Sequence, residues 1–577
     1  MSSNRHNRLF LIIIFLCSSL TCSGTSSSSV QQLSSCLAGH GVGNFTALSN
    51  DTGHSGSGKG DDNPSTLYYS LLNFSIHNLR FSGSSVPKPA VIILPESLEQ
   101  LVSAVGCCRD GQWEIRVRCG GHSYEGTSSV AADGAPFVII DMMNLNKVEV
   151  DMQAEMAWVE GGATLGEVYS AIAEASPHHG FSAGSCPTVG VGGHISGGGF
   201  GLLSRKYGLA ADNVEDALLV DSSGQLFDRR TMGEDVFWAI RGGGGGIWGI
   251  VYAWKIKLLP VPKTVTSFII SRMGRTDNRT GRGKFIPELV KKWQYVAPSL
   301  GDDFYLSVFV GANLHEAREA PQISATFKGF FLGPRRRAVS IMNRAFPELG
   351  LTEEDCHEMS WIESILFFSG LGDGSSVSDL KSRFSKDKLY FKAKSDYIRS
   401  PIPMSGINSA LNILDREPKG YVILDPYGGM MDNISNDFIA FPHRKGNLFT
   451  IQYLVEWHEE DDCNSEQYIE WIREFYASMA PHVSEGPRAA YINYIDLDLG
   501  VMGLKVNLDE DCKDCDDVDI ARQWGEKYFL GNYERLVRAK TLIDPSNVFR
   551  NEQGIPPMPN LNKRYDRHRS STQAHST

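Results

Sequence analysis

Apolar residues in the first part of the chain follow two periodicities. Short apolar runs at 90–94, 137–141 and 217–220 have the length of buried strands, which is about 4–8 residues. Between the second and third runs, apolar side chains recur every three or four positions, as on one face of a helix. These residues are Leu165, Val168, Tyr169 and Ile172. The pattern predicts an α+β region.

Predicted strands and helices also alternate beyond Pro260-Val-Pro262, which we interpret as a domain boundary. A last helix is predicted over 524–542, and Pro545 ends it because proline cannot continue a helix. A chain of 577 residues is too long to fold around one simple core, so we expect an α+β protein of two lobes. Helical stretches separate the further predicted strands, which are 268–271, 304–310, 323–331 and 449–454.

The amino terminus has the features of a secretory signal peptide. Arg5 and Arg8 precede an apolar run at 9–20, and small polar residues follow, so we predict a signal peptide over 1–24. The run is too short to span a bilayer, and no later run replaces it. We therefore expect a soluble protein of the secretory pathway, in the vacuole or outside the cell in the wall. Five N-x-[ST] triplets predict glycosylation there: Asn44, Asn50, Asn73, Asn278 and Asn433.

Charge and cysteine content exclude other classes of function. The net charge is −12 without a Lys/Arg stripe, so we expect no nucleic-acid partner, and Arg335–Arg337 is interpreted as a solvated loop. Of 11 cysteines, Cys17 and Cys22 lie in or beside the signal segment. Cys512 and Cys515 form a C-x-x-C, but a metal site needs a second pair. We predict a local disulfide or two free thiols there, and no metal.

Two common sequence motifs match this chain, but the segments that follow them do not fit the folds that the motifs would indicate. Gly244, Gly246 and Gly249 fit G-x-G-x-x-G, but a strand-like segment follows where a dinucleotide-binding fold needs a helix. Residues 180–184 fit the G-x-S-x-G nucleophile elbow around Ser182, but a proline and a glycine-rich stretch follow instead of a helix. We therefore reject a Rossmann fold and a serine hydrolase.

Two other glycine-rich segments, 118–126 and 184–201, carry the candidate chemistry. In the first, paired glycines precede His122 and present it on a tight loop; such a histidine is more often a hydrogen-bonded surface residue. In the second, seven glycines follow Pro187, at a cost in backbone entropy. A chain tolerates this where main-chain N–H groups surround an anion such as a pyrophosphate, or in a flexible surface loop. Cys186 and His194 within the segment favour the binding site.

Both segments resemble those of the berberine bridge enzyme-like flavoproteins of plants, which have the vanillyl-alcohol-oxidase type of FAD-binding fold. The resemblance extends from about Ser35 to Pro557. Within the group, the chain is most similar to the branch with proteins of tobacco pyridine-alkaloid metabolism; pollen allergens and carbohydrate oxidases belong to the wider group. Further matching segments are 235–241, 425–429, 441–444, 491–496 and 551–557.

The resemblance implies how the lobes divide the chain. An FAD-binding domain over 25–262 is expected to be completed by a carboxy-terminal segment over 484–562. A substrate-binding domain over 263–483 is expected to be an antiparallel sheet covered by helices. Residues 563–577 are expected to form a disordered tail. The family also implies a disulfide between Cys36 and Cys107, and leaves the neighbouring Cys108 unexplained.

The resemblance also implies a covalent cofactor. His122 is expected to bond the flavin 8α-methyl carbon and Cys186 to bond C6 of the flavin ring; a neutral imidazole and a thiolate are both suitable nucleophiles. Two bonds would hold the flavin rigidly and raise its reduction potential. His194 is expected to stabilise negative charge on the reduced flavin. The other residues expected at the cofactor are Gly120, Gly121, Val189, Gly190, Gly192, Gly193, Gly198, Gly199 and Asn493.

In this family the active-site base is a tyrosine of the segment that begins at residue 491. Tyr494 is our first choice and Tyr491 the second; a phenol with a pKa near 10 needs nearby cations or hydrogen bonds to act at neutral pH. Gln452 and Tyr124 match other pocket residues of the family. Thr450 stands where many relatives carry Glu or Lys, and Phe200 where monolignol oxidases carry Tyr, which argues against a monolignol substrate.

The expected reaction is hydride transfer from a small metabolite to flavin N5, with proton removal by Tyr494 and reoxidation by O2 to give H2O2. Valine at position 189 indicates an oxidase, because leucine there tends to block oxygen in this family. The tobacco-like branch favours an alkaloid substrate. The alternatives are a carbohydrate oxidase and a flavoprotein without net oxidation, such as a cyclisation catalyst or an allergen-like glycoprotein. We expect a monomer.

Overall fold

The structure is a computed structural model, and it describes residues 27–48, 64–274, 285–314, 322–372, 374–385, 388–503 and 515–559. The predicted signal peptide and tail lie outside these residues, as do Cys17, Cys22, Asn50, Asn278 and Cys512. None of the helices within the described ranges has both the length and the apolar character needed to cross a membrane.

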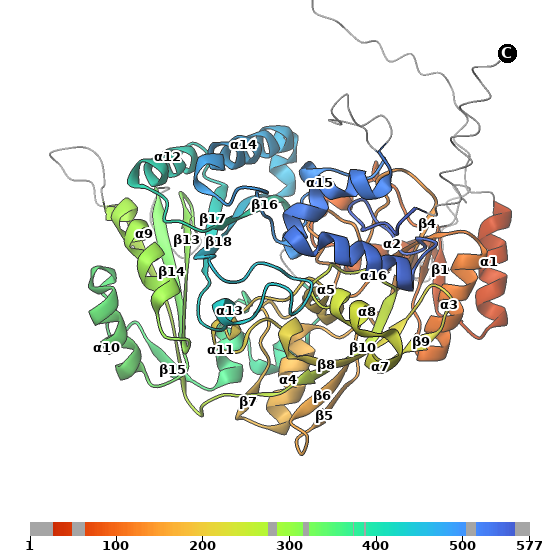
Figure 1. Ribbon diagram of the computed structural model, residues 1–577, viewed down its shortest axis with the longest axis horizontal. Coiled ribbons are helices and arrows are strands. Elements are labelled where there is room, and N and C mark those ends of the chain that lie inside the picture. Colours follow the sequence, from red (N-terminus) through yellow and green to blue (C-terminus); the bar gives the residue numbers. More distant parts are fainter. Residues whose placement is uncertain are drawn as a thin grey trace, which may run out of the picture.

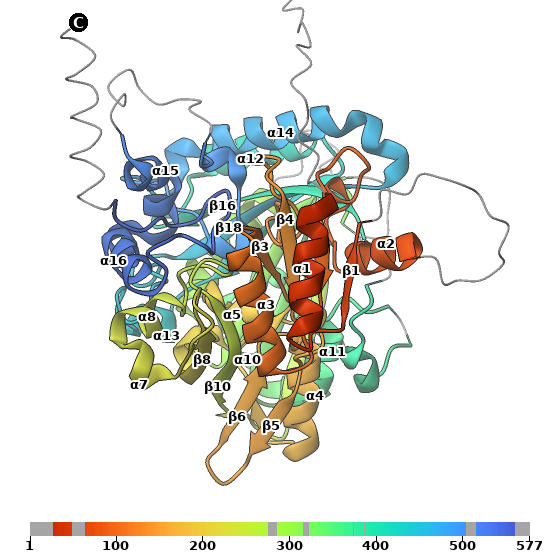
Figure 2. The same ribbon diagram turned by 90° about the vertical axis from the view of Figure 1, so that its right-hand side faces the viewer.

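The amino-terminal part of the chain builds a four-stranded sheet in the order β1-β2-β4-β3, from β1 (Phe45–Ala47), β2 (Val91–Ile93), β3 (Glu114–Arg118) and β4 (Phe137–Asp141). β2, β4 and β3 are parallel, and β1 is antiparallel to β2. The helices α1 (Ser27–Gly39) and α3 (Leu98–Asp110) lie side by side over this sheet (Figure 2). The Cys36–Cys107 disulfide joins these two helices.

A five-stranded antiparallel sheet follows, in the order β5-β6-β10-β8-β9. Its strands are β5 (Val148–Asp151), β6 (Met156–Glu160), β8 (Val214–Val220), β9 (Leu226–Phe227) and β10 (Ile250–Lys257). Between them come α4 (Leu165–Ala175), which a Thr164–Glu167 capping box begins, and several short elements. The short elements are β7 (His179–Gly180), α5 (Val191–Ser196), α6 (Ser204–Tyr207), α7 (Arg229–Met232), α8 (Glu234–Ala239) and, after β10, β11 (Leu259–Pro260).

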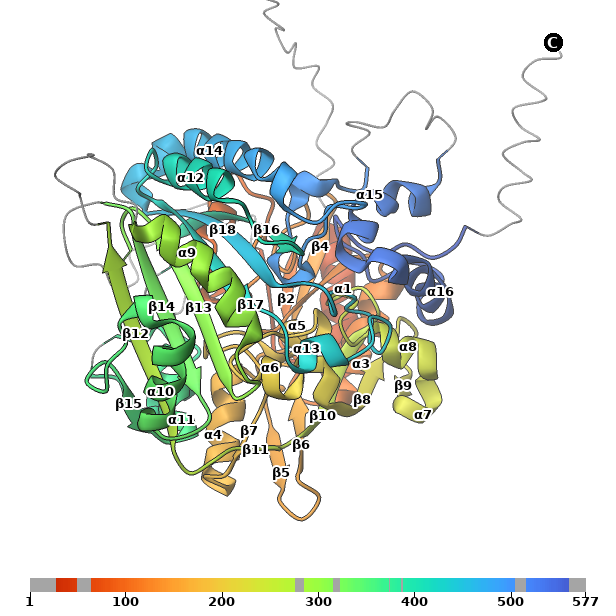
Figure 3. The same ribbon diagram turned by 60° about the vertical axis from the view of Figure 1, so that its left-hand side comes forward.

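The middle of the chain forms a seven-stranded antiparallel sheet in the order β15-β12-β14-β13-β17-β18-β16. Four helices pack their apolar side chains on one face of it (Figure 3). The other face is turned toward the first lobe. The strands are β12 (Val265–Met273), β13 (Phe304–Gly311), β14 (Ser324–Phe331), β15 (His357–Met359), β16 (Tyr390–Ile398), β17 (Gly420–Pro426) and β18 (Phe449–Trp457). The four helices are α9 (Phe285–Val296), α10 (Arg335–Ala345), α12 (Met404–Leu414) and α14 (Ser465–Ser478).

The carboxy-terminal segment returns to the first lobe. Its helices are α15 (Asp517–Phe529) and α16 (Tyr533–Ile543). α16 lies beside α8, which is some 300 residues earlier in the chain, and α15 lies against α16 (Figure 1). The fully buried Lys540 ammonium of α16 donates to the carbonyls of Ile247 and Phe549 and pairs with Asp544. This lysine therefore ties the glycine-rich segment at 242–249 to the end of the described chain. The remaining helices are α2 (Pro64–Phe74), α11 (Trp361–Phe368) and α13 (Met430–Asn433).

The strong periodicities predicted these elements well. The α+β class is confirmed, and the segment predicted as a strand over 250–258 is β10 (Ile250–Lys257), where the dinucleotide-binding fold would need a helix. Ser182 is buried and donates to the Gly208 carbonyl, which agrees with rejecting a nucleophile there. Cys108, unexplained by its sequence, is a buried free thiol of α3 whose pKa burial raises to about 12.

Three expectations were wrong in detail. The single helix predicted over 524–542 is two helices, because Leu530 takes a φ of +47° that a helix cannot contain. Arg335–Arg337 is solvated but forms the first turn of α10 and not a loop. The glycine-rich stretch at 190–201 is not a loop throughout, since residues 191–196 form α5.

Candidate functional site

A cavity of about 600 Å³ lies where three parts of the chain meet. Its wall contains residues of both glycine-rich segments that carry the candidate chemistry, residues of β13, β14, β17 and β18, and the segment at 492–495. The cavity is therefore bounded by the first lobe, the inner face of the seven-stranded sheet and the carboxy-terminal segment. We refer to it below as the central cavity.

His122 and Cys186, which both lie on this wall, contact the same buried hydroxyl group. Nε2 of His122 lies 2.9 Å from Oγ1 of Thr188, and Sγ of Cys186 lies 3.7 Å from the same oxygen. The ring of His77 stacks on that of His122 with their centroids 3.6 Å apart. Since Thr188 engages Nε2, Nδ1 is the nitrogen of His122 that remains for a ligand. Neither Thr188 nor His77 was singled out from the sequence.

The surroundings set the protonation of these two side chains. Burial, together with the charges of His77 and Lys388, lowers the pKa of His122 well below its ordinary value, so the imidazole is neutral. Burial raises the pKa of the Cys186 thiol, and hydrogen bonds from Thr188 and Val189 oppose that rise. Cys186 is nevertheless exposed at the cavity wall. A neutral imidazole is a nucleophile as it stands, and the accessible Cys186 becomes one when it loses its proton.

The glycines on the wall fit a large, flat cofactor. A Cβ added at Gly193 or Gly246 would meet no protein atom within 4 Å, so a side chain at either position would occupy the cavity itself. Gly120 and Gly190 serve another purpose, because a Cβ on Gly120 would lie 2.3 Å from the nitrogen of Gly190. These two glycines let the His122 and Cys186 segments touch. Gly121, with a φ of +71°, turns the chain just before His122.

Not every predicted cofactor residue lines the cavity. Gly121, Gly190, Gly192, Val189 and Asn493 do, whereas Gly198 and Gly199 do not. A Cβ at Gly198 would press on Phe441, and one at Gly199 would press on Ala210 and His194, so these two glycines permit close packing behind the wall.

His194 is held as a neutral imidazole beside this wall. The Gly184 N–H donates to its Nε2 at 3.1 Å, which leaves Nδ1 as the protonated nitrogen. Burial lowers the pKa of His194 to about 4. The Asn493 amide donates both to the His194 carbonyl and to the Tyr491 hydroxyl, each at 3.0 Å. The predicted cofactor residues of the first lobe are thus bonded directly to the segment that carries the predicted base.

The two candidate bases have different positions. Tyr494 lines the cavity, stacks on Tyr124 at 5.4 Å and has no hydrogen bond from its hydroxyl to the described residues. Tyr491 is buried behind the wall, where its hydroxyl accepts from Gly199 and Asn493. Burial raises the pKa of both phenols, well above 10 for Tyr494, where the charges of Tyr124 and Asp425 add to the rise. The expected cation beside the base is not among the groups that act on Tyr494.

Gln452 orients the other cavity tyrosine. Its amide donates to the Tyr124 hydroxyl at 2.7 Å across 328 residues of sequence. Phe200 also lines the cavity and stacks on Tyr427 at 5.3 Å. Thr450 is buried and donates to the Asp396 carbonyl, so it is not part of the wall. A threonine here therefore leaves no group in the position of an acid or base.

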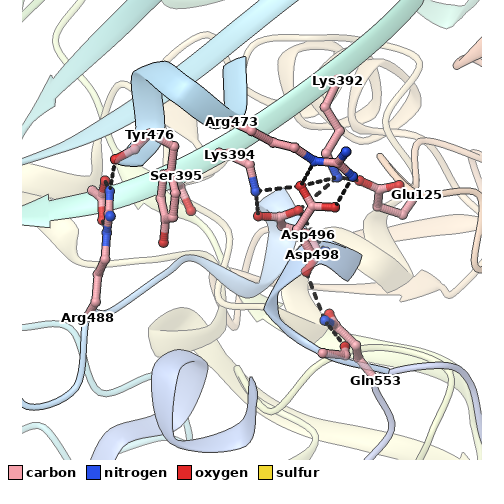
Figure 4. A network of polar contacts seen from close by, with 12 residues as sticks. Glu125, Lys392, Lys394, Ser395, Arg473, Tyr476, Arg488, Asp496, Asp498 and Gln553 are labelled. Atoms are coloured by element: carbon pink, nitrogen blue, oxygen red, sulfur yellow. Dashed lines mark hydrogen bonds and ion pairs between the residues drawn. The ribbon is translucent and has the colours of Figure 1, made fainter. Parts of the chain in front are cut away.

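A buried ion network behind the wall joins the loops that carry Tyr124 and Tyr494 (Figure 4). The Lys392 ammonium of β16 pairs with Glu125, which follows Tyr124, and with Asp496 at 2.8 Å. Lys394, two residues on, pairs with Asp496 at 2.7 Å and with Asp498 at 2.8 Å. Both lysine side chains are 3% exposed. The network thus fixes both tyrosine loops to one edge strand. Sequence reasoning missed it entirely.

Three predicted glycosylation sites and one cysteine of the C-x-x-C motif lie within the described residues. Asn44, Asn73 and Asn433 are exposed. Cys515 is in a disulfide whose partner lies outside the described residues. Glycosylation and the secretory location therefore remain predictions.

Comparisons with known proteins agree with this geometry. Residues 89–229 match the family model described as FAD binding domain, and residues 490–556 match the one described as berberine and berberine like. Berberine bridge enzyme-like D-2 of Nicotiana tabacum is 59% identical over 566 residues, covering 97% of each chain. Reticuline oxidase of Papaver somniferum is 47% identical, covering 96% of each chain.

Solved structures give the same result. The berberine bridge enzyme of Eschscholzia californica, at 48% identity, superimposes with a TM-score of 0.83 over 92% of this chain and 100% of that chain. A variant of Phl p 4 described as a glucose oxidase, at 40% identity, superimposes with a TM-score of 0.80, again over 92% of this chain and 100% of that one. The chain therefore belongs to the berberine bridge enzyme-like family of FAD-linked oxidoreductases.

Proposed function

We propose that the protein oxidises a small plant alkaloid with FAD held covalently by His122 and Cys186, and that O2 accepts the electrons and becomes H2O2. The observation that carries this proposal is that the two nucleophiles, which share the cavity wall with Tyr124 and Tyr494, both contact the buried Thr188 hydroxyl. Relatives named reticuline oxidase support an alkaloid as the substrate class.

FAD bound in the central cavity supplies the acceptor for a hydride from the substrate. The chain's own residues supply the rest. Gln452 fixes the Tyr124 hydroxyl, and the parallel rings of Tyr124 and Tyr494 provide a flat apolar surface against which a substrate can lie. The Tyr494 hydroxyl, which has no hydrogen bond to the described residues, is placed to take a proton from the substrate once it has given up its own to solvent. His194 offers Nδ1–H as a donor, while burial keeps it uncharged.

A carbohydrate oxidase is the second candidate, because the superimposed Phl p 4 variant is described as a glucose oxidase. A screen separates the two. Tertiary and cyclic amines and a set of oligosaccharides are each mixed with the purified protein, first without oxygen to follow loss of flavin colour and then in air to follow peroxide. We expect amines to bleach the flavin and form peroxide. Bleaching by sugars alone supports the second candidate, and no bleaching by either class supports a flavoprotein without net oxidation.

The choice of base predicts unequal effects of removing the two hydroxyls. Tyr494→Phe is expected to slow anaerobic flavin reduction by about 10²–10⁴-fold, the usual contribution of a positioned acid or base. Tyr491→Phe is expected to have a much smaller effect, because that hydroxyl lies behind the wall. Stopped-flow absorbance of the two variants, each checked for full flavin content, measures this. An equal or larger loss in Tyr491→Phe would reverse the assignment.

Valine at position 189 predicts fast reaction with oxygen. Val189 lies on the cavity wall three residues after Cys186, where one more methylene would fill space that O2 needs to reach the flavin. Val189→Leu is expected to slow reoxidation about tenfold or more, equivalent to ~1.4 kcal/mol in the barrier. Anaerobic reduction by substrate is the control and should change little. Unchanged reoxidation in the variant would show that oxygen enters elsewhere.

A further inference from the structure

A carboxylate on the sheet side of the central cavity forms no ion pair with the described residues, although Lys328 on the same wall acts on it from a greater distance. Asp425 of β17 is 7% exposed and lines the cavity. Its Oδ1 accepts a hydrogen bond from the Tyr305 hydroxyl, and among the described residues its Oδ2 accepts none. No Lys, Arg or His of the described chain lies within 4.0 Å of the carboxylate. An ionised carboxylate this deeply buried is costly unless a cation pairs with it.

The wall around Asp425 is aromatic. On β13, Tyr305 and Phe309 face the cavity, and Phe309 pairs with Ile423, which shares the face of Asp425. Phe200 and Tyr494 line the same cavity from the other side. The Lys328 ammonium lies 4.1 Å from the centre of the Phe309 ring, which shows that this wall accommodates a positively charged nitrogen.

We propose that Asp425 is the anionic contact for a protonated or quaternary amine of the substrate, with the rings of Tyr305 and Phe309 completing the site. Carboxylate and aromatic faces together are the groups that recognise ammonium ions in proteins. A neutral sugar would leave the carboxylate buried and unpaired. The inference rests on the proposed function, because it names the substrate class of the same cavity.

The charge of Asp425 depends on pH in a definite direction. Burial raises its pKa to about 6, against the opposing effects of the Tyr305 hydrogen bond and the Lys328 charge. Its other neighbours on the wall are phenols: burial raises the pKa of Tyr305, Tyr427 and Tyr494 above 10, so they stay neutral. The carboxylate is therefore ionised above about pH 6 and neutral below it. Affinity for a permanent cation should follow that change.

Choline and its neutral isostere 3,3-dimethylbutan-1-ol test this without knowledge of the natural substrate. Isothermal calorimetry with the purified protein measures the affinity of both. At pH 8 we expect choline to bind about tenfold or more tightly than the alcohol, and at pH 5 we expect that preference to be largely lost. Choline keeps its charge throughout, so the loss reports the protein. No preference for choline at pH 8, or a preference that persists at pH 5, would overturn the proposal.

Variants give an independent check. Asp425→Asn is expected to abolish the preference at pH 8, whereas Ser128→Ala, which alters a polar residue elsewhere on the cavity wall, should retain it. Retention of the preference in Asp425→Asn would contradict the assignment. The test does not depend on turnover. Asp425-dependent binding without flavin reduction by amines would refute only the proposed function, and flavin reduction by amines without such binding would refute only this inference.

Discussion

When the protein is denatured in acid, we expect the yellow flavin to precipitate with the chain in the wild type, in His122→Ala and in Cys186→Ala. Only the double variant should release it. Each bond alone holds the cofactor through denaturation, since a covalent link does not depend on the fold. Both nucleophiles lie on the cavity wall and contact the same Thr188 hydroxyl, so one flavin can reach both of them.

Cys119 is the matched control for this experiment. It is a free thiol on the same wall, in contact with the glycines of the second segment, and burial raises its pKa to about 12. It should therefore stay a thiol and form no bond, and Cys119→Ala should retain flavin as the wild type does. Absorbance of the acid pellet and supernatant at the flavin maximum gives the covalent fraction. Release from the wild type would refute covalent attachment, and release from either single variant would show that one bond is missing.

Sequence periodicity predicted the parts of the fold that depend on local pattern. The apolar run predicted as a strand over 137–141 is β4, with the same first and last residues. The prediction succeeded because each of these residues is buried and parallel strands flank β4 on both sides. The break between α15 and α16 was not predictable in this way. Leu530 has good helical propensity and does not interrupt the apolar pattern, so the periodicity hides the break, although Gly531 and Asn532 directly after it are residues that commonly end helices.

The residues of the candidate site also differ in whether a local pattern could predict them. His122, Cys186 and the glycines around them stand in two short segments, so the family resemblance of those segments was enough to predict them. Asp425, although inside a matching segment, reads as a turn residue before proline until β17 places it on a cavity wall. Thr188 and His77 matter through contacts with His122 that span 66 and 45 positions. A pattern within one segment contains no information on such contacts.

The buried ion network is the clearest example of contacts that a local pattern does not reveal. Its disruption is also the second change for which we expect a large effect. In the sequence, Lys392 and Lys394 alternate with smaller residues as on the solvated face of an edge strand. In the structure the same face is buried by Glu125, 267 positions earlier, and by Asp496, 104 positions later. Burial alone would lower the pKa of Lys392, but Asp496, Glu125 and Asp498 together raise it, so the ammonium stays charged.

Lys392→Met is accordingly expected to destabilise the protein by about 3–5 kcal/mol, the usual result of removing one partner from a buried ion pair. Methionine fills the space but leaves Glu125 and Asp496 without their shared cation. Arg416→Met is the control, because the Arg416–Glu474 pair is 57% exposed on both sides and should contribute about 0–1 kcal/mol. Urea unfolding followed by tryptophan fluorescence, with flavin content matched, compares the two variants.

A rescue variant distinguishes lost charge balance from lost packing. Asp496 keeps its pair with Lys394, but Glu125 loses its closest cation, so Glu125→Gln added to Lys392→Met should recover part of the lost stability. No recovery would mean that the lysine acts mainly through its apolar stem. The network also predicts a functional readout: Glu125 and Asp496 stand one and two residues from Tyr124 and Tyr494, so loosening them should slow flavin reduction even where the protein is folded. Full reduction rate in folded Lys392→Met would limit the network to a structural role.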